Sequence, residues 1–359
     1  MNSYLSGRSQ AVYLDGAMSS FLSVEVGVPQ GSILGPLCYI LFTNDLPESI
    51  LDTSSHVHFS DLTTHCAECG GLCCFADDST YSVTGKNIET LEKKLNDKYK
   101  ALANYMNSNR LKLNDDKTHL LIMTTGQKQK LLNIQVKIRT SAEDIKPIRT
   151  EKLLGVNVQN YLKWSEYIQN NERSLIIQLN TRVNALKQIS SAATFKTRLM
   201  VANGIFCSKL IFQISLWGGA ADYLLSSLQI IQNKAARQVT KRDKYSPIVE
   251  ILRQCGWLSV RQLVFYHSII QIYKTKQTSY PKYISDKLNL EFPYNTRLAG
   301  SESVRMGTVF KSRLALTERS FLNRSTVNFN QLPTELRQIQ KIELFKRKLK
   351  QWVILNIRI

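Results

Sequence analysis

The sequence of 359 residues contains no run of about 18 apolar residues, the length that a helix needs to cross a bilayer. The opening residues, MNSYLSGRSQ, lack the apolar centre of a secretory signal peptide. Internal repeats and low-complexity tracts are also absent, and 43% hydrophobic residues are ample for ordinary globular cores. We therefore expect an intracellular protein, nuclear or cytoplasmic, that is not secreted and has no membrane partner.

Acidic residues are scarce after the first third of the chain. Residues 1–120 contain 9 Lys/Arg and 14 Asp/Glu, whereas residues 121–359 contain 38 Lys/Arg and 14 Asp/Glu. A basic surface of that size usually meets a polyanion, with nucleic acid as the first candidate and an anionic membrane as the second. The alternative is a solvated basic surface without a specific partner.

Cysteine is too unevenly placed for a disulfide framework, because the count of seven is odd and four cysteines lie within nine residues. Cys66 and Cys69 form one C-x₂-C, which is half of a zinc-ribbon pattern. His65, or Cys73 and Cys74, could complete the four ligands of a structural Zn²⁺ site. The alternative that stays open is a set of unpaired thiols in a loop.

Hydrophobic patterning predicts a mixed first part of the chain. Alternation around Asp15-Gly16 predicts a two-residue β-hairpin, and CCFADDSTYS predicts a second strand–turn–strand unit. Apolar residues at steps of three and four predict a helix at 88–108. With further strands in LKLNDDKTHLLIM and EKLLGVNV, we expect residues 1–160 to form an α+β layer of antiparallel strands and packed helices. Residues 48–72 are expected to be an inserted loop.

Strands become scarce after Leu162, where the pattern favours a basic, mostly α-helical region. Aromatic residues alternate with cations in KWSEY, KRDKYS and SYPKYIS, which suits stacking on bases and contact with phosphates. Tryptophan is more often a core residue, so we expect Trp164, Trp217, Trp257 and Trp352 to be packed inside. The expected helices cover residues 165–189, 195–217, 224–241, 258–274 and 334–355.

Two adjacent carboxylates, Asp77 and Asp78, interrupt a run that otherwise predicts strand. Aspartate is disfavoured in strands, and two neighbouring negative charges repel each other. Carboxylates at the tip of a hairpin suit a hard cation such as Mg²⁺, which takes oxygen ligands and would relieve that repulsion. Taken alone, the pair has a plainer alternative, a solvated turn.

Several motifs in a fixed order favour the metal-binding interpretation. VPQGSILGPL at 28–37 and NDLP at 44–47 precede FADD, and LNDDKT and LLGV follow it. This series resembles the palm of reverse transcriptases of non-LTR (LINE-like) retrotransposons. The resemblance extends from YLSGRSQ to FNQLPTELR and FKRKLKQW, and so covers nearly the whole chain. It implies an RNA-directed DNA polymerase that binds an RNA template, a DNA primer and deoxynucleotides, and uses two Mg²⁺ ions for nucleotidyl transfer.

The resemblance also implies roles for single residues. Asp77 matches the catalytic metal-binding carboxylate, Asp78 its neighbour, and Lys117 a lysine that assists the leaving pyrophosphate. The substrate-binding positions are the loop near template and nucleotide, the aromatic beside the carboxylates, and the hairpin that holds the primer end: Gln30, Gly31, Ser32, Phe75, Leu154 and Gly155. The plainer alternatives are a solvated turn lysine, a helix cap in the loop, and ordinary core and turn residues in the hairpin.

One departure from the family concerns a third metal-binding carboxylate, which the family supplies from a strand well before the GVPQGS loop. Here 26 residues precede Gly27, and their sole aspartate, Asp15, lies in the predicted hairpin turn. We therefore expect an N-terminally truncated polymerase that lacks the fingers and the first catalytic aspartate and is inactive alone. The expected domains are an incomplete palm at 1–160, a helical thumb-like domain at 161–242 and a basic helical region at 243–359.

Two alternatives from other classes stay open. The first is a non-enzymatic nucleic-acid-binding remnant of such an element, which binds an RNA–DNA duplex without extending it. The second is a small zinc-dependent interaction module, which depends on the cysteines alone.

Overall fold

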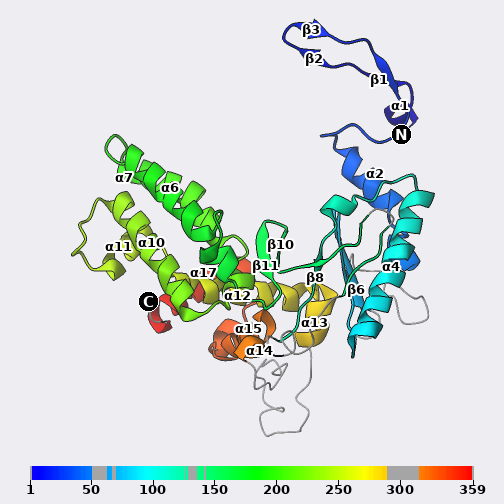
Figure 1. The fold of residues 1–359 in the computed structure, drawn as a ribbon. Helices are drawn as coiled ribbons and strands as arrows, with labels where there is room; N and C mark the ends of the chain where they lie inside the picture. The colour runs from blue at the N-terminus through cyan, green and yellow to red at the C-terminus, as the bar shows by residue number, and fades with distance from the viewer. Residues whose placement is uncertain are drawn as a thin grey trace. The chain divides into compact units, whose positions relative to one another are not determined.

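The structure, a computed structural model, describes residues 2–50, 63–66, 70–125, 127, 136–140, 143–288 and 315–357. The chain divides into two compact units: unit 1 comprises Met1–Lys117 and Ile138–Asp144, and unit 2 comprises Thr118–Lys137 and Ile145–Ile359. Unit 1 is a mixture of helices and small sheets, whereas unit 2 is mostly helical (Figure 1). None of the helices in the described ranges combines the length and the apolar character that a bilayer crossing needs.

A β-hairpin arm opens unit 1 after the short helix α1 (Asn2–Leu5) and extends away from the rest of that unit (Figure 1). Asp15 and Gly16 connect its two central strands with φ of 49° and 82°, the left-handed backbone of a type I′ turn. The predicted Asp-Gly hairpin is therefore confirmed. The outer pair of strands is β1 (Arg8–Gln10) and β4 (Leu22–Val24), and the inner pair is β2 (Tyr13–Leu14) and β3 (Ala17–Met18).

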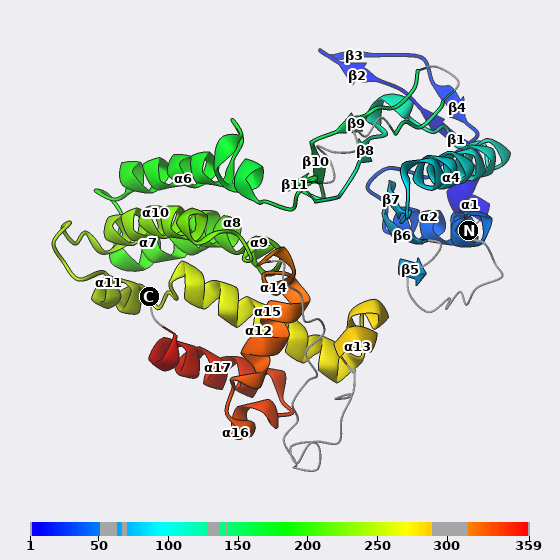
Figure 2. The same ribbon diagram turned by 60° about the horizontal axis from the view of Figure 1, so that its bottom comes forward.

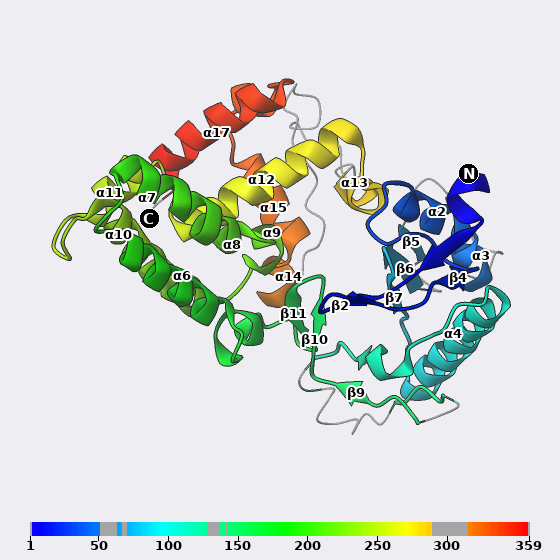
Figure 3. The same cartoon turned by 90° about the horizontal axis from the view of Figure 1, so that it is seen from above.

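The core of unit 1 lies between a three-stranded antiparallel sheet and two helices. Leu72 on the sheet packs with Leu46, Ile50 and Tyr105, which the helices contribute, and all four are buried. Figure 3 shows the sheet and the longest helix of the unit from above. The elements are α2 (Leu34–Phe42), α3 (Leu46–Ile50), β5 (Thr63–Cys66), β6 (Gly70–Phe75), β7 (Asp78–Ser82) and α4 (Ile88–Ser108), with strand order β5-β6-β7.

Helix α4 has the predicted bounds, and its start has a clear local cause. The side chain of Asn87 accepts a hydrogen bond from the Thr90 N–H at 2.8 Å and so caps the helix. The expectation of a plain loop at 48–72 is wrong in part, because α3 runs to Ile50 and strand β5 pairs with β6. β-branched Thr63 and Thr64 favour that strand. Residues 51–62 and 67–69 lie outside the described residues.

Unit 2 begins with two small strand pairs and continues as a helical bundle. The strands are β8 (Leu120–Leu121) with β9 (Pro147–Ile148), and β10 (Thr150–Leu153) with β11 (Val156–Gln159). The helical elements are η2 (Glu166–Asn170), α6 (Leu175–Ile189), α7 (Phe195–Ala202), η3 (Asn203–Cys207), α8 (Ser208–Ile211), α9 (Ile214–Trp217), α10 (Asp222–Thr240), α11 (Ile248–Cys255), α12 (Val260–Thr278), α13 (Lys282–Leu288), α14 (Ala315–Glu318), α15 (Phe321–Asn330), α16 (Thr334–Arg337) and α17 (Ile342–Asn356).

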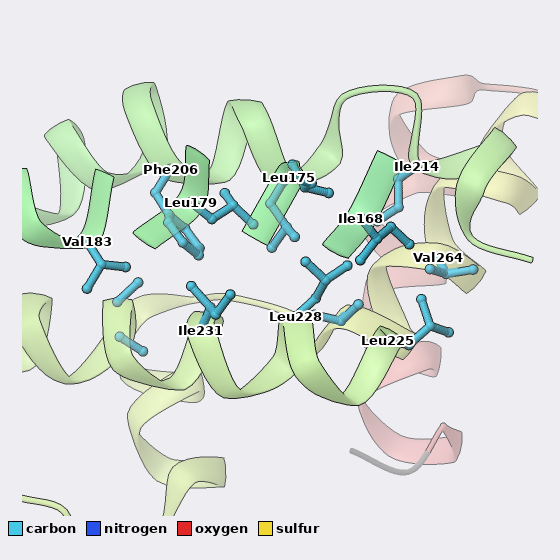
Figure 4. Close-up of a cluster of buried hydrophobic side chains, with 14 of the residues drawn as sticks. Ile168, Leu175, Leu179, Val183, Phe206, Ile214, Leu225, Leu228, Ile231 and Val264 are labelled. Atoms are coloured by element: carbon cyan, nitrogen blue, oxygen red, sulfur yellow. The ribbon is translucent and has the colours of Figure 1, made fainter. Parts of the chain in front are cut away.

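Helices α6, α10, α12 and α17 form successive layers of this bundle (Figure 2). One core fills the space between α6 and α10, where Leu179 and Leu228 are fully buried (Figure 4). A second core lies between α12, α15 and α17 and contains Tyr273 stacked on Phe345, with ring centroids 3.9 Å apart. Helix α12 has buried residues in both clusters, so it joins the two cores into one unit.

Several helices predicted as continuous are interrupted. The predicted helix 165–189 is broken between η2 and α6, where Asn171 is extended and Ser174 takes the N-cap position of α6. The predicted helix 195–217 turns at Gln213, whose φ is +52°. The expectation for the tryptophans holds: Trp164 and Trp217 are buried, and Trp257 and Trp352 pack partly buried against the two cores.

Candidate active site

The adjacent carboxylates lie at the tip of the β6–β7 hairpin. Phe75 pairs with Asp78, so Ala76 and Asp77 alone make the turn. Ala76 has a φ of +52°, a left-handed conformation that is unfavourable for a residue with a Cβ. Backbone strain of this kind persists where the surrounding ladder enforces it, and it is common at functional sites. Asp77, Asp78 and Phe75 are all exposed, so the hairpin presents both carboxylates to solvent.

Helix α2 lies near the hairpin turn, as the electrostatics of Tyr39 indicate. The pKa of the Tyr39 phenol is raised, first by burial and then by the negative charge of Asp77 and by Cys74. A carboxylate acts on a phenol in this way only at short range in a partly solvated environment. The turn with Asp77 is therefore close to the helix that follows the Gln30–Ser32 loop.

The loop before α2 has two left-handed glycines and a hydroxyl that closes it. Gly27 and Gly31 have φ of 81° and 79°, and the Ser32 hydroxyl accepts a hydrogen bond from the Gly35 N–H at 3.1 Å. A Cβ on Gly35 would lie 2.8 Å from the Ser32 Oγ, so a larger residue there would displace the Ser32 hydroxyl from this hydrogen bond. The Ser32 hydroxyl thus bonds a backbone N–H in the first turn of α2, whose N-cap residue is Ile33, and Gln30 is exposed.

Lys117 ends the short helix η1 (Asp115–Lys117), and its side chain is exposed. Its N–H donates to the Asn114 side chain at 3.3 Å, and the Asp115 carboxylate accepts a hydrogen bond from the Tyr99 hydroxyl at 2.5 Å. Helix α4 therefore holds the LNDDKT turn through Tyr99, and Lys117 is carried on a turn with a fixed backbone.

A second tyrosine of α4 holds the NDLP motif. The Tyr105 hydroxyl donates to Asp45 at 2.6 Å, and Tyr105 is buried. The pKa of Tyr105 is raised, first by burial and then by its hydrogen bond to Asp45. The pKa of Tyr99 is raised in the same way, first by burial and then by its hydrogen bond to Asp115. The apolar spacing that predicts this helix gave no sign of the hydrogen bonds made by Tyr99 and Tyr105. The available signal was that a buried phenol needs a hydrogen-bond partner.

Replacement of Tyr105 by phenylalanine tests this anchoring. We expect the free energy of unfolding of unit 1 to fall by about 1–2 kcal/mol, because the hydrogen bond to a charged acceptor is lost. The folded state keeps the phenol protonated beyond the pH at which an unfolded tyrosine ionises, about 10. The stabilisation is therefore fully present below that pH and is lost as the pH rises above it. Urea unfolding followed by circular dichroism from pH 8 upward measures both effects.

The matched control for Tyr105 is the phenylalanine variant of Tyr13, which is 71% exposed on the hairpin arm. Its unfolding midpoint should equal that of the wild type at every pH. A difference between wild type and the Tyr105 variant that stays constant or grows above pH 10 would contradict the anchoring by the neutral phenol.

Leu154 and Gly155 make the turn of the β10–β11 hairpin, with φ of 46° and 84°. A Cβ placed on Gly155 would lie 3.4 Å from the ring of Phe212, so the turn packs closely on that aromatic. Leu154 is exposed. These two residues belong to unit 2, whereas the carboxylates, the Gln30–Ser32 loop and Lys117 belong to unit 1.

The cysteine hypothesis receives no support from the residues that can be described. Cys69 and the side chain of Cys66 lie outside the described part of the chain. Cys73 and Cys74 are neighbours on β6 and so point to opposite faces of the sheet. Within the described ranges, no group of three or more His, Cys, Asp or Glu residues gathers as a metal site. The zinc site stays a prediction.

Comparison with known proteins gives a family and several relatives. Residues 1–158 match the family described as reverse transcriptase (RNA-dependent DNA polymerase). The chain is 25% identical over 247 residues to the probable RNA-directed DNA polymerase from transposon X-element of Drosophila melanogaster, covering 67% of this chain and 24% of that protein. It is 23% identical over 291 residues to the RNA-directed DNA polymerase from mobile element jockey of the same species, covering 80% and 30%.

A third relative, the probable RNA-directed DNA polymerase from transposon BS of Drosophila melanogaster, is 24% identical over 278 residues, covering 75% of this chain and 28% of that protein. The matched stretches thus span between 24% and 30% of the length of these three curated relatives. No solved structure matches the chain.

Proposed function

We propose that the chain is part of an RNA-directed DNA polymerase of a non-LTR retrotransposon, because residues 1–158 match the reverse transcriptase family and the chain is similar to polymerases of such elements. In this proposal the residues of the family match act as the polymerase palm, and the helices beyond residue 160 act as the thumb-like and C-terminal basic regions. The observation that carries the proposal is the strained β6–β7 turn, which lies inside the family match and presents two exposed carboxylates.

The donor set at this turn suits a divalent cation such as Mg²⁺, which prefers carboxylate oxygens. Both carboxylates are exposed, and the ion pairs found among the described residues involve neither of them. In this chemistry, bound cations neutralise the transferring phosphoryl group and lower the pKa of the attacking hydroxyl. Asp77 and Asp78 would hold the cation, and exposed Lys117 would suit the charge of the leaving pyrophosphate.

Among the described residues, the metal site proposed here is incomplete. The described residues gather no third His, Cys, Asp or Glu around a common point. We propose that two carboxylates alone bind the cation weakly, and that the chain by itself binds a primer–template duplex without extending it. The second candidate function is a nucleic-acid-binding remnant. It would also bind the duplex without extending it, but its binding would not depend on a metal ion.

Exposed aromatic residues beside lysines support contact with nucleic acid in either case. Tyr245 is 82% exposed, and the Lys244 Nζ lies 4.9 Å from its ring centroid. Tyr280 and Tyr283 of SYPKYIS are also exposed. Cations that neutralise phosphates and rings that stack on bases are the usual means of binding single strands.

The experiment measures binding and extension by the full chain on an RNA template annealed to a labelled DNA primer, with and without Mg²⁺. We expect binding, no incorporation, and an increase in affinity on adding Mg²⁺ that is absent in Asp77→Asn. An affinity that is the same with and without Mg²⁺ favours the nucleic-acid-binding remnant. Absence of binding contradicts both candidate functions, and incorporation abolished by Asp77→Asn overturns the proposed inactivity.

A further inference from the structure

The hairpin arm of unit 1 exposes apolar side chains along its length. The arm stands away from the sheet and helices of the same unit (Figure 1). Six apolar residues on the arm, or within two residues of its end, are between 61% and 75% exposed: Val12, Leu14, Met18, Phe21, Leu22 and Val26. Single exposed apolar residues are normal on a protein surface, but apolar residues gathered on one protruding element mark an interaction site.

Helix α2 adds to this apolar surface. Its sequence, LGPLCYILF, is apolar on every side, and a helix of that kind is normally buried. Here Gly35 is its only buried residue. Five of its large side chains are at least 39% exposed: Leu34, Leu37, Ile40, Leu41 and Phe42. The base of the arm is tied to the loop before α2, because the Arg8 Nη2 donates to the Gly27 carbonyl at 2.6 Å.

The segment that forms the arm and α2 carries almost no charge. Residues 9–44 contain two charged residues, Asp15 and Glu25, and no Lys, Arg or His. The phosphates of a nucleic acid and the headgroups of an anionic membrane both attract cations, so neither suits this surface. An apolar surface depleted of charge is instead typical of the centre of a protein–protein interface.

The exposed apolar area is large enough for a stable contact between two proteins. At these exposed fractions one such side chain presents roughly 100 Å², so the arm and α2 together present on the order of 1,000 Å². Each partner of a standard interface contributes about 800 Å², whereas the largest apolar patch on a typical monomer is about 300–600 Å². The area is therefore sufficient for a dimer.

The strands of the arm indicate which partner fits. Within the described ranges, β1 pairs only with β4 and β2 only with β3, so each strand keeps one unpaired edge. A two-stranded ribbon is marginally stable by itself, and additional strands stabilise it. Natural edge strands avoid pairing with other chains through Lys, Pro or another charged residue, but β2, β3 and β4 contain none of these. A second arm of the same sequence is thus free to pair with the first.

We propose that the hairpin arm and α2 form the contact with a second copy of this chain, in a dimer in which equivalent edges of the two arms pair about a two-fold axis. The identical arm supplies the additional strands, an equally uncharged surface and the same apolar area. This inference goes beyond the proposed function, since it needs neither the carboxylates of the β6–β7 turn nor a nucleic acid.

The test is the mass of the purified full chain, measured by size-exclusion chromatography with light scattering. Nuclease treatment and high salt ensure that nucleic acid does not bridge two copies. The wild type should have twice the 41.0 kDa of one chain. The double variant Leu14→Lys, Leu22→Lys should have the mass of one chain, with a dissociation constant raised at least about 30-fold, the effect of losing one interface hot spot.

The matched control is Leu355→Lys on α17, which makes the same chemical change at a residue that is 82% exposed outside this surface. This variant should keep the dimer mass. Far-ultraviolet circular dichroism checks that all variants are folded. Hydrogen exchange then locates the contact: the amides of residues 9–24 should exchange more slowly in the dimer than after dilution to single chains, because their free edges become paired.

A wild type with the mass of one chain would overturn the proposal and would mean that a different polypeptide covers this surface. A dimer that survives the double variant, or exchange in the arm that is independent of concentration, would also overturn it. So would a mass that grows beyond two chains, because a two-fold contact closes at the dimer.

Discussion

Replacement of Trp217 by alanine is expected to lower the free energy of unfolding of unit 2 by about 3–5 kcal/mol, the range for removing a fully buried large aromatic side chain. Trp217 has no exposed surface, and its ring lies 6.5 Å from that of Tyr167 between centroids. Its indole N–H also satisfies the Phe212 carbonyl at the end of α8. The variant therefore loses dispersion contacts, a buried hydrogen bond and the support of the neighbouring turn.

Urea unfolding followed by far-ultraviolet circular dichroism measures this loss, because most of the helical signal comes from unit 2. Trp257→Ala is the matched control. Trp257 stacks on Phe206 at 6.1 Å between centroids, but it is only half-buried and bonds Asn203 near the surface. Trp257→Ala should therefore lower the free energy of unfolding by clearly less than Trp217→Ala. Equal losses in the two variants would contradict the burial of Trp217 in the core.

Local patterns predicted the elements whose determinants are local. Helix α4 has the expected bounds because its apolar spacing and its Asn87 cap are adjacent in sequence. The Asp15-Gly16 hairpin was predictable because those two residues accept left-handed backbone at little cost. The break between η2 and α6 was not predicted, because the apolar spacing continues across it and the extended Asn171 interrupts it.

The candidate site was predictable only where its residues are contiguous. The strained turn at Ala76 and Asp77 follows from two aspartates between strand-forming residues. The bond between Tyr105 and Asp45 joins residues 60 positions apart, and periodicity carries no information on such pairs.

Asp77→Asn is expected to reduce the affinity of the chain for a divalent cation by at least about tenfold, since even an outer-shell partner of a metal ligand is worth 10- to 100-fold. The variant keeps the size of the side chain and removes one charge from the tip of the hairpin. It also relieves the repulsion between neighbouring carboxylates, so the unfolding midpoint should not fall. Asp97→Asn, an exposed aspartate on α4 in the same unit, is the control and should bind the cation like the wild type.

The proposed function requires that the hairpin carboxylates bind a divalent cation near α2. Mn²⁺ titration of the chain carrying ¹³C-labelled tyrosine, observed by nuclear magnetic resonance, tests this binding. The charge of Asp77 raises the pKa of Tyr39, so Tyr39 reports on this hairpin. Exposed Tyr245 lies in unit 2 and serves as the reference tyrosine. Mn²⁺ should broaden the Tyr39 resonance first in the wild type and in Asp97→Asn, but not in Asp77→Asn. Equal broadening of Tyr39 in Asp77→Asn, or no preference for Tyr39 over Tyr245 in the wild type, would contradict it.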